Sequence, residues 1–186
     1  MKVSNLPITG IAVALAGSVM LAQTPGSKAP AGGSATAARA DIKGEGISGS
    51  ISLNERKPGV VEYTIRVKGL KPGRHGVHLH AVGTCEPDFA AAGGHFDPGP
   101  SGNSDPDANH PFHMGDIPNL EAGPDGSATI QGVTTRVTLS EGPLSLFDAD
   151  GTAIIIHGNP DQGITGAPKS GVSGGPRIAC GVVSRQ

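Results

Sequence analysis

Polar and apolar side chains alternate most clearly along residues 61–67, where Val61, Tyr63, Ile65 and Val67 are separated by polar residues. This period of two is typical of a β-strand with one buried face and one face in water. Similar short segments occur at residues 46–53, 76–80, 127–139, 152–157 and 177–183, with Gly, Pro and Asp between them. No long stretch follows the 3.6-residue period of a helix. The pattern predicts an all-β domain, either an antiparallel sandwich or a flattened barrel.

Two long stretches, residues 84–119 and 158–176, do not alternate and are rich in Gly, Pro, Asp and Asn. Loops of this length are uncommon inside a compact domain and usually have a function. Most of the unusual chemistry of the chain lies in these stretches or beside them. They are therefore predicted to be two long functional loops.

The N-terminal region differs in composition from the rest of the chain. Lys2 is followed by the uncharged residues 6–22, which predicts a signal peptide over residues 1–22, cleaved near Ala22. A hydrophobic strand or a membrane anchor is the alternative. Residues 23–40 are rich in Ala, Gly, Ser, Thr and Pro, which predicts a flexible low-complexity linker. Residues 41–186 are then one domain, and we expect an exported protein, periplasmic or extracellular.

Charge and cysteine content fit an exported protein without a nucleic-acid partner. The formal net charge is -2, and it becomes one unit more negative when Lys2 leaves with the signal peptide. Such a balance gives no reason to expect binding to nucleic acid. The two cysteines, Cys85 and Cys180, form a pair that is usually a disulfide in exported proteins. Two free buried thiols are the alternative.

Seven histidines carry the main chemical signal. His78 and His80 flank Leu79 on a predicted strand, so both imidazoles share one face while Leu79 points to the core. His157 ends the apolar run 154–156 and would add an imidazole beside this pair. A site made only of imidazoles suits copper.

A second group of ligands lies in the first long stretch. His113 and Asp116 form a His-x-x-Asp pattern, His110 stands three residues upstream, and His95 occurs earlier. A tetrahedral set of imidazoles with one carboxylate suits zinc. Any one of these histidines alone is more often a surface or hydrogen-bonded side chain. The whole ordered set, together with the strand histidines, favours metal binding.

Five ordered motifs carry a resemblance to a known family. They are Gly-Arg-His-Gly-Val-His-Leu-His at residues 73–80, Gly-Gly-His-Phe at 93–96, His-Met-Gly-Asp at 113–116, Ile-His at 156–157 and Pro-Arg-Ile-Ala-Cys-Gly at 176–181. Together they resemble the bacterial exported form of the copper/zinc superoxide dismutases over residues 44–183. The resemblance implies a Greek-key β-barrel. It also implies an enzyme that converts superoxide to oxygen and hydrogen peroxide by alternate reduction and oxidation of copper, with a neighbouring structural zinc.

The resemblance further implies the metal ligands. Those of copper would be His78, His80, His95 and His157. Those of zinc would include His95, His113 and Asp116, so that one imidazolate bridges both ions.

Other residues match supporting positions of the family. His75 resembles a structural histidine that is bonded to backbone, and Cys85 and Cys180 match an intrachain disulfide. Asp161 matches an aspartate that joins a copper ligand to a zinc ligand, and such carboxylates orient imidazoles. A solvated turn aspartate is the alternative for Asp161.

One position departs from the family pattern. The family commonly has its middle zinc histidine about eight residues after the bridging one, and Asn103 stands there in this chain. His110 is the one histidine left without a role, so we predict that a rearranged loop brings it to the zinc. The alternative is a weak zinc site, or one completed by water, with copper binding intact.

Arg177 matches the family's arginine beside the copper, where a fixed guanidinium would attract and orient the superoxide anion. A surface arginine at a strand end is the alternative. Lys169, in the second long stretch, is a weaker candidate for the same steering. His95 would take up a proton during the cycle, so Arg177 and His95 are the predicted catalytic residues.

Two other functions are compatible with the sequence. A copper-binding or copper-delivery module without turnover would keep the fold and the histidines. A purely structural exported domain would leave the ordered histidines unexplained. The expected substrate is the superoxide anion. We expect no stable membrane association after removal of the signal peptide. Dimers in the family use different faces in different branches, so the sequence is compatible with a homodimer but selects neither an oligomeric state nor an interface.

Overall fold

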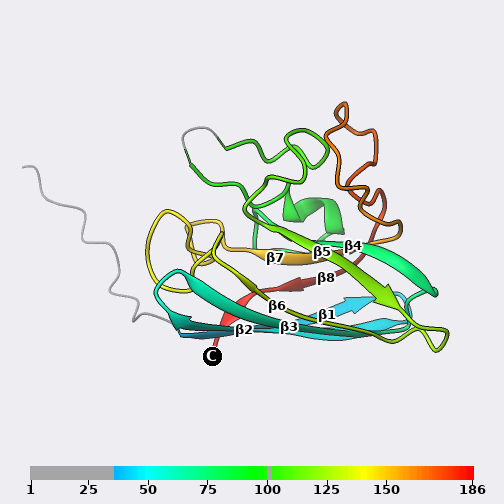
Figure 1. Cartoon of the computed structure of the whole chain (residues 1–186), viewed down its shortest axis with the longest axis horizontal. Coiled ribbons are helices and arrows are strands. Elements are labelled where there is room, and N and C mark those ends of the chain that lie inside the picture. The colour runs from blue at the N-terminus through cyan, green and yellow to red at the C-terminus, as the bar shows by residue number, and fades with distance from the viewer. Residues whose placement is uncertain (1–35, 100–101) are drawn as a thin grey trace, which may run out of the picture. The chain divides into compact units, whose positions relative to one another are not determined.

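The computed structural model describes residues 36–99 and 102–186 (Figure 1). The predicted signal peptide and most of the predicted linker lie outside these residues. One short 3-10 helix, η1 (Phe89–Ala92), accompanies the strands. The strands are β1 (Ala37–Gly44), β2 (Ile47–Lys57), β3 (Val60–Lys68), β4 (Gly73–His80), β5 (Asp116–Ala122), β6 (Ala128–Thr134), β7 (Ala153–His157), β8 (Arg177–Val182) and β9 (Ser184–Arg185). The all-β prediction is confirmed for this part of the chain.

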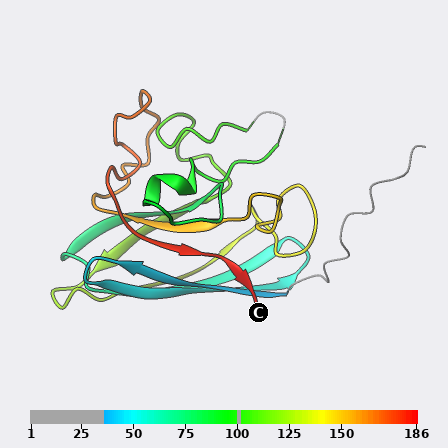
Figure 2. The ribbon, with the colours of Figure 1, turned by 180° about the vertical axis from the view of Figure 1, so that it is seen from behind.

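The strands form one antiparallel sheet in the order β5-β4-β7-β8-β1-β2-β3-β6, with β9 paired to β1. The two edge strands, β5 and β6, contact each other, so the sheet curls into a nearly closed barrel (Figure 2). Strands distant in sequence become neighbours, such as β4 beside β7 and β8 beside β1. These crossovers are those of a Greek key, which confirms the predicted barrel.

The barrel interior is filled by alternate residues of the strands. On β3, Val61 and Ile65 are fully buried, and on β4, Val77 and Leu79 point into the same core. Burying an aliphatic side chain of this size stabilises the fold by about 1.5–3 kcal/mol. Because Val77 and Leu79 face inward, His78 between them must lie on the outer face of the sheet.

Two long connections cover that outer face along β4, β7 and β8 (Figure 1, Figure 2). The first loop, residues 81–115, contains η1 and joins β4 to β5, and the second loop, residues 158–176, joins β7 to β8. Under this cover β7 and most of β4 are buried on both faces. The predicted disulfide between Cys85 and Cys180 is present and ties the first loop to β8. No helix in the described ranges is long and apolar enough to cross a membrane.

The predicted start of the domain is wrong by four residues. β1 begins at Ala37 and pairs with β2 along its whole length, so residues 37–40 belong to the barrel and not to the linker. Ala38 and Ala40 are buried in the core. Their small side chains gave the segment the composition of a linker and hid the inward-facing alternation.

Two further boundaries differ from the prediction. β5 occupies residues predicted to be loop up to residue 119, and it buries Ile117, Leu120 and Ala122. Its uneven spacing accompanies a register shift opposite β4, so no strict alternation marks it in the sequence. The strand predicted over residues 127–139 ends at Thr134. The remainder of that segment reaches the core from an irregular connection.

Candidate metal centre

β4 and β7 bring three histidines together under the loops. The two strands are hydrogen-bonded neighbours, with His80 opposite Ala153. His78 lies two residues before His80, and His157 ends β7. His95 of the first loop joins them through a bridge to His80. All four histidines are at most 2% exposed, so the imidazoles predicted to bind copper are buried side by side.

The backbone on either side of His95 holds its ring in place. The His95 amide donates to the Ser104 carbonyl at 2.9 Å. A Cβ on Gly94 would overlap this same carbonyl oxygen, so only glycine allows the approach of the two segments. The Gly-Gly-His pattern therefore has a local steric reason as well as a ligand at its end.

Each of these imidazoles uses one ring nitrogen for a hydrogen bond that fixes the ring. His80 Nδ1 lies 3.0 Å from the Gly93 carbonyl oxygen, and His157 Nδ1 lies 3.0 Å from that of Gly175. These carbonyls accept the Nδ1 proton, which leaves the lone pair on Nε2. A metal ligand needs this tautomer and this orientation.

The other ring nitrogens converge without partners. Within the described residues, His78 Nδ1 and the Nε2 atoms of His80, His95 and His157 are buried and have no hydrogen bond. The ligand atoms of the four residues lie within 4.8 Å of one another. Buried polar atoms are seldom left unsatisfied in native proteins. Four converging lone pairs fit a bound cation, and an all-nitrogen set fits copper.

Burial keeps these rings neutral and ready to bind metal. It lowers the pKa of His78 to about 3 and that of His157 to about 4, and it holds the pKa of His80 well below its usual value. Nearby His95 adds to each of these reductions. A metal binds the unprotonated imidazole, so no proton has to be displaced from these rings near neutral pH.

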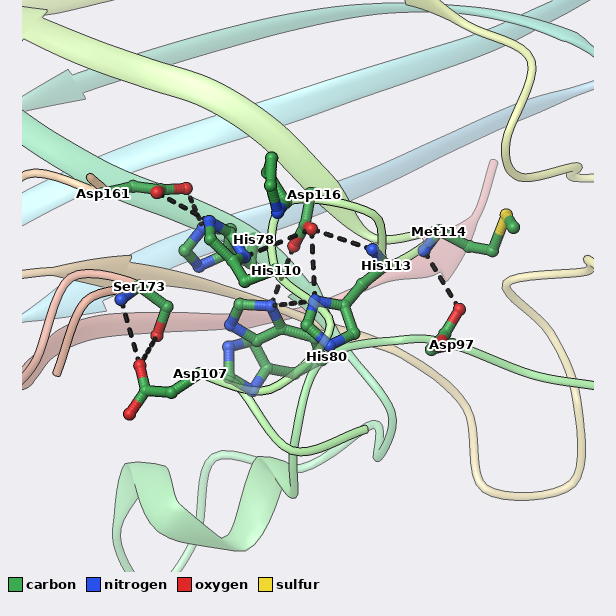
Figure 3. A network of polar contacts seen from close by, with 12 residues as sticks. His78, His80, Asp97, Asp107, His110, His113, Met114, Asp116, Asp161 and Ser173 are labelled. Carbon is green, nitrogen blue, oxygen red and sulfur yellow. Dashed lines mark hydrogen bonds and ion pairs between the residues drawn. The ribbon is translucent and has the colours of Figure 1, made fainter. Parts of the chain in front are cut away.

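A second cluster surrounds Asp116 at the start of β5 (Figure 3). Its Oδ1 lies 2.8 Å from His95 Nδ1, and its Oδ2 lies 3.1 Å from His113 Nδ1 and 3.3 Å from His110 Nδ1. His95 Nδ1 and His113 Nδ1 are 3.3 Å apart. Three imidazole nitrogens and a carboxylate therefore meet at one point, which is the donor set of a tetrahedral zinc site.

The rearranged first loop does bring His110 to this cluster. The Thr165 hydroxyl of the second loop donates to the His110 carbonyl at 2.7 Å, and Asn109 before it has a left-handed φ of 60°. Asn103 is engaged elsewhere, since its Oδ1 accepts a bond from the Asp105 amide. His110, and not residue 103, thus faces Asp116.

The carboxylates give this second cluster the opposite electrostatic character. Burial alone would lower the pKa of His110, but hydrogen bonds with Asp116 and Asp161 raise it to about 9. The pKa of His113 is also raised by Asp116 against the effect of burial. Burial opposes ionisation of Asp116, yet the surrounding imidazoles hold its pKa far below the usual range. The cluster attracts positive charge.

Asp161 of the second loop connects the two clusters (Figure 3). Its Oδ2 lies 3.0 Å from His78 Nε2, and its Oδ1 lies 2.6 Å from His110 Nε2. Asn119 clamps the Asp161 backbone, donating to its carbonyl at 2.9 Å and accepting from its amide at 2.8 Å. Asp161 is therefore not a solvated turn residue. Sequence reasoning missed Asn119, which carries no motif of its own.

His75 stays outside both clusters. Its Nδ1 lies 2.8 Å from the His157 carbonyl oxygen and its Nε2 lies 2.9 Å from that of Lys71. Both ring nitrogens thus face backbone, as the sequence predicted, and the ring braces the end of β7 that carries His157.

Arg177 lies at the mouth of the copper-side cluster. Its guanidinium donates to the carbonyls of Phe89 and Gly93 in the first loop, both at 2.6 Å. The disulfide at Cys180 holds the same strand and loop together. Arg177 and His157 line a pocket of about 330 Å³ that opens to solvent, and Lys169, Asp105 and Asp107 are among the other residues of its wall. We call this space the entrance pocket.

A family model described as copper/zinc superoxide dismutase matches residues 47–183 of the chain. The chain belongs to the copper/zinc superoxide dismutase family. A copper/zinc superoxide dismutase from Caulobacter vibrioides is 38% identical over 142 residues, which are 73% of this chain and 78% of that protein. Among solved structures, the clock protein EA4 superposes with a TM-score of 0.70 at 25% sequence identity, over 83% of this chain and 97% of that one.

Membership of the copper/zinc superoxide dismutase family gives the chain its reaction, the conversion of superoxide to oxygen and hydrogen peroxide. It also gives the cofactors, copper and zinc, with which both histidine clusters are compatible. The disulfide and the bacterial relative are consistent with an exported protein.

Proposed function

We propose that the two clusters divide the metals of this superoxide dismutase between them. The copper ligands are His78, His80, His95 and His157, and the zinc ligands are His95, His110, His113 and Asp116. The observation that carries this assignment is the ring of His95. Its Nδ1 contacts Asp116 and His113, while its Nε2 is buried and without a partner among the copper-side rings. One imidazole is thus placed to bridge both ions.

Geometry alone also groups His78 with the zinc-side ligands, because its ligand atom lies within 4.8 Å of those of His95, His110 and Asp116. We assign His113 in place of His78. The Nε2 of His78 is already bound by Asp161, and its Nδ1 is one of the four unsatisfied copper-side nitrogens. His113 Nδ1 is directed at Asp116 and His95.

Copper, when bound, supplies one-electron transfer in both directions, and zinc supplies a fixed positive charge without redox chemistry. The residues of the chain hold the ligands in position and supply a proton. His95 holds or releases a proton at Nε2, the nitrogen that is buried without a hydrogen-bond partner, while its Nδ1 stays fixed beside Asp116. Asp161 fixes the orientations of the His78 and His110 rings, because each of its carboxylate oxygens contacts one of them.

Arg177 attracts and orients superoxide at the entrance pocket. Its two backbone hydrogen bonds fix the guanidinium beside His157, and burial lowers its pKa without removing its charge near neutral pH. Lys169 adds a second cation to the same wall. Asp105 and Asp107 add two carboxylates to that wall, so the attraction of superoxide depends on the positions of the two cations and not on the net charge of the pocket.

Two ligand variants test this division. His80→Ala is expected to lose copper and at least about 100-fold in kcat/KM while keeping zinc, since even changes to supporting residues cost 10–100-fold. His113→Ala is expected to lose zinc and keep copper. Metal analysis and superoxide consumption by the purified proteins measure both effects. A wild-type protein that holds both metals but does not consume superoxide would instead favour copper delivery.

We also propose a location for the protein. Residues 1–22 act as a signal peptide, and the mature protein works in the periplasm or outside the cell. The Cys85–Cys180 disulfide supports this location, because disulfides form and persist in oxidising compartments outside the cytosol. Release from the membrane after signal removal and assembly into a homodimer stay predictions.

A further inference from the structure

Asp107, in the first loop, is a buried carboxylate that the proposed mechanism does not use. It is 3% exposed, and all its side-chain partners lie in the second loop. Its Oδ1 accepts bonds from the amide and hydroxyl of Ser173 at 3.0 and 2.9 Å (Figure 3). Its Oδ2 accepts one from the Gly171 amide at 2.9 Å. Its own carbonyl accepts the Gly166 amide at 2.8 Å.

These four bonds hold the second loop on both sides of Lys169. Gly166 lies before it, and Gly171 and Ser173 lie after it. A buried carboxylate is costly unless several donors satisfy it. Burial opposes ionisation of Asp107, but the donors from Gly171 and Ser173 lower its pKa, so the ionised form is the one that grips the loop.

Lys169 needs such support. Its φ of 62° lies in the left-handed region, which side chains other than glycine rarely adopt unless their surroundings impose it. The adjacent turn, where the Ser170 amide donates to the Ala167 carbonyl at 3.0 Å, is the local part of that support. Asp107 supplies the tertiary part. In this conformation Lys169 lines the entrance pocket with Arg177 and His157.

We propose that Asp107 is a positioning residue that locks the second loop so that Lys169 presents its charge at the entrance pocket and increases the capture of superoxide. The proposal rests on the proposed function of that pocket. Asp107 lines the same pocket, but its carboxylate oxygens are engaged by Gly171 and Ser173, so it acts through Lys169. The first loop, through its rearranged segment, thus shapes both the zinc side, by His110, and the approach to the copper side, by Asp107.

A double-mutant cycle tests the proposal with the metal-loaded full chain. Lys169→Gln is expected to lower kcat/KM at low salt by about threefold, a modest share of the gains that steering provides. Asp107→Ala should lower it by less, because it also removes a negative charge from the pocket wall. Both should reduce the slope of kcat/KM against ionic strength. The double variant should lose no more than Lys169→Gln alone, because the two residues serve one effect. Copper and zinc contents should stay as in wild type.

Additive losses, or an unchanged ionic-strength slope in Asp107→Ala, would overturn the proposal. Ser173→Ala, which removes one of the three side-chain contacts, is the matched milder variant and should show a smaller loss. If Asp107→Ala does not fold, Asp107→Asn replaces it in the cycle, since it keeps the shape and an acceptor oxygen. Its effect should again vanish in the Lys169→Gln background.

A second readout does not depend on catalysis. In the metal-free protein, amide hydrogen exchange at Gly171 and Ser173 reports the bonds to Asp107. Exchange there should accelerate in Asp107→Ala and remain at the wild-type rate in Lys169→Gln. If the wild-type protein failed to consume superoxide, the proposed function would be wrong. The exchange rates, together with the affinity of azide for the bound copper, would still test whether Asp107 fixes the second loop and Lys169. Equal exchange and equal azide affinity in all variants would refute it.

Discussion

The copper-side and zinc-side clusters are built by different parts of the fold. His78, His80 and His157 stand on β4 and β7, two hydrogen-bonded strands whose other face lies in the barrel core. His110 and His113 stand on the first loop, between strands. The position of the first group follows from the sheet, and the position of the second follows from contacts between loops.

The difference shows in what holds each ring. The backbones of His78, His80 and His157 belong to paired strands, although the rings of His78 and His157 also contact the second loop, at Asp161 and the Gly175 carbonyl. On the zinc side, both the backbone and the ring of His110 are held by the second loop, through Thr165 and Asp161. A change in the second loop should therefore reach the zinc cluster sooner than the copper cluster. Three measurements on variants and on the metal-free protein distinguish the strand-borne cluster from the loop-borne one.

The largest effect is expected from removing the loop-borne ligand itself. His110→Ala should weaken zinc binding by about 100-fold or more, because loss of a direct ligand exceeds the 10–100-fold typical of supporting residues. Copper binding should change much less. Competition with a chromogenic chelator measures both affinities.

Asn103→Ala is the matched control for this loop. Its side chain only caps the turn at Asp105, so zinc affinity should stay near that of wild type. If Asn103→Ala weakened zinc binding more than His110→Ala, the assignment of His110 as the middle zinc ligand would be wrong.

The sequence predicted the strand-borne ligands better than the loop-borne ones. His78 and His80 could be placed because alternation on a strand fixes the face of each residue, and His157 because it ends a run of buried isoleucines. His110 was predicted only by elimination, with the family resemblance as a guide. Nothing local in its sequence shows that it contacts Asp161, 51 residues away.

The missed features share a physical cause. Asp107 and Asn119 act through backbone amides and carbonyls of the second loop, and such partners leave no pattern in the sequence. β1 was assigned in part to a linker because the buried faces of Ala38 and Ala40 are too small to stand out. Hydrogen bonds between loops and the burial of small residues leave no sequence pattern, so they can be recognised only in the folded structure.

A smaller effect is expected from Asp161→Asn, which changes the residue shared by both clusters. The amide keeps the shape of Asp161 but cannot accept bonds from His78 and His110 at both of its terminal atoms. Zinc affinity should fall about 10–100-fold and copper affinity by less, since His78 stays fixed by β4. The exposed Asp148→Asn is the control. An equal loss of both metals would show that the strands do not protect the copper side.

The smallest effect concerns the stability of the metal-free protein as pH changes. The pKa of His78 is about 3 when folded, and an unfolded histidine titrates near 6.5, so the unfolded chain binds more protons between these values. Stability should fall as pH drops below about 6.5. His157, with a pKa of about 4, acts in the same direction. The copper-side histidines thus destabilise the metal-free fold on the acid side.

His110 should act on the alkaline side. Its folded pKa of about 9 means that the folded chain binds the extra proton between about pH 6.5 and 9, so that stability is lost as pH rises through this range. Urea unfolding of the chelated protein should therefore give a maximum near pH 6.5, with each group changing the free energy of unfolding by about 1.4 kcal/mol per pH unit along its limb. His110→Gln should flatten the alkaline limb and leave the acid limb. Flattening of both limbs would mean that the two clusters titrate as one unit, and the separation between strand-borne and loop-borne ligands would not hold.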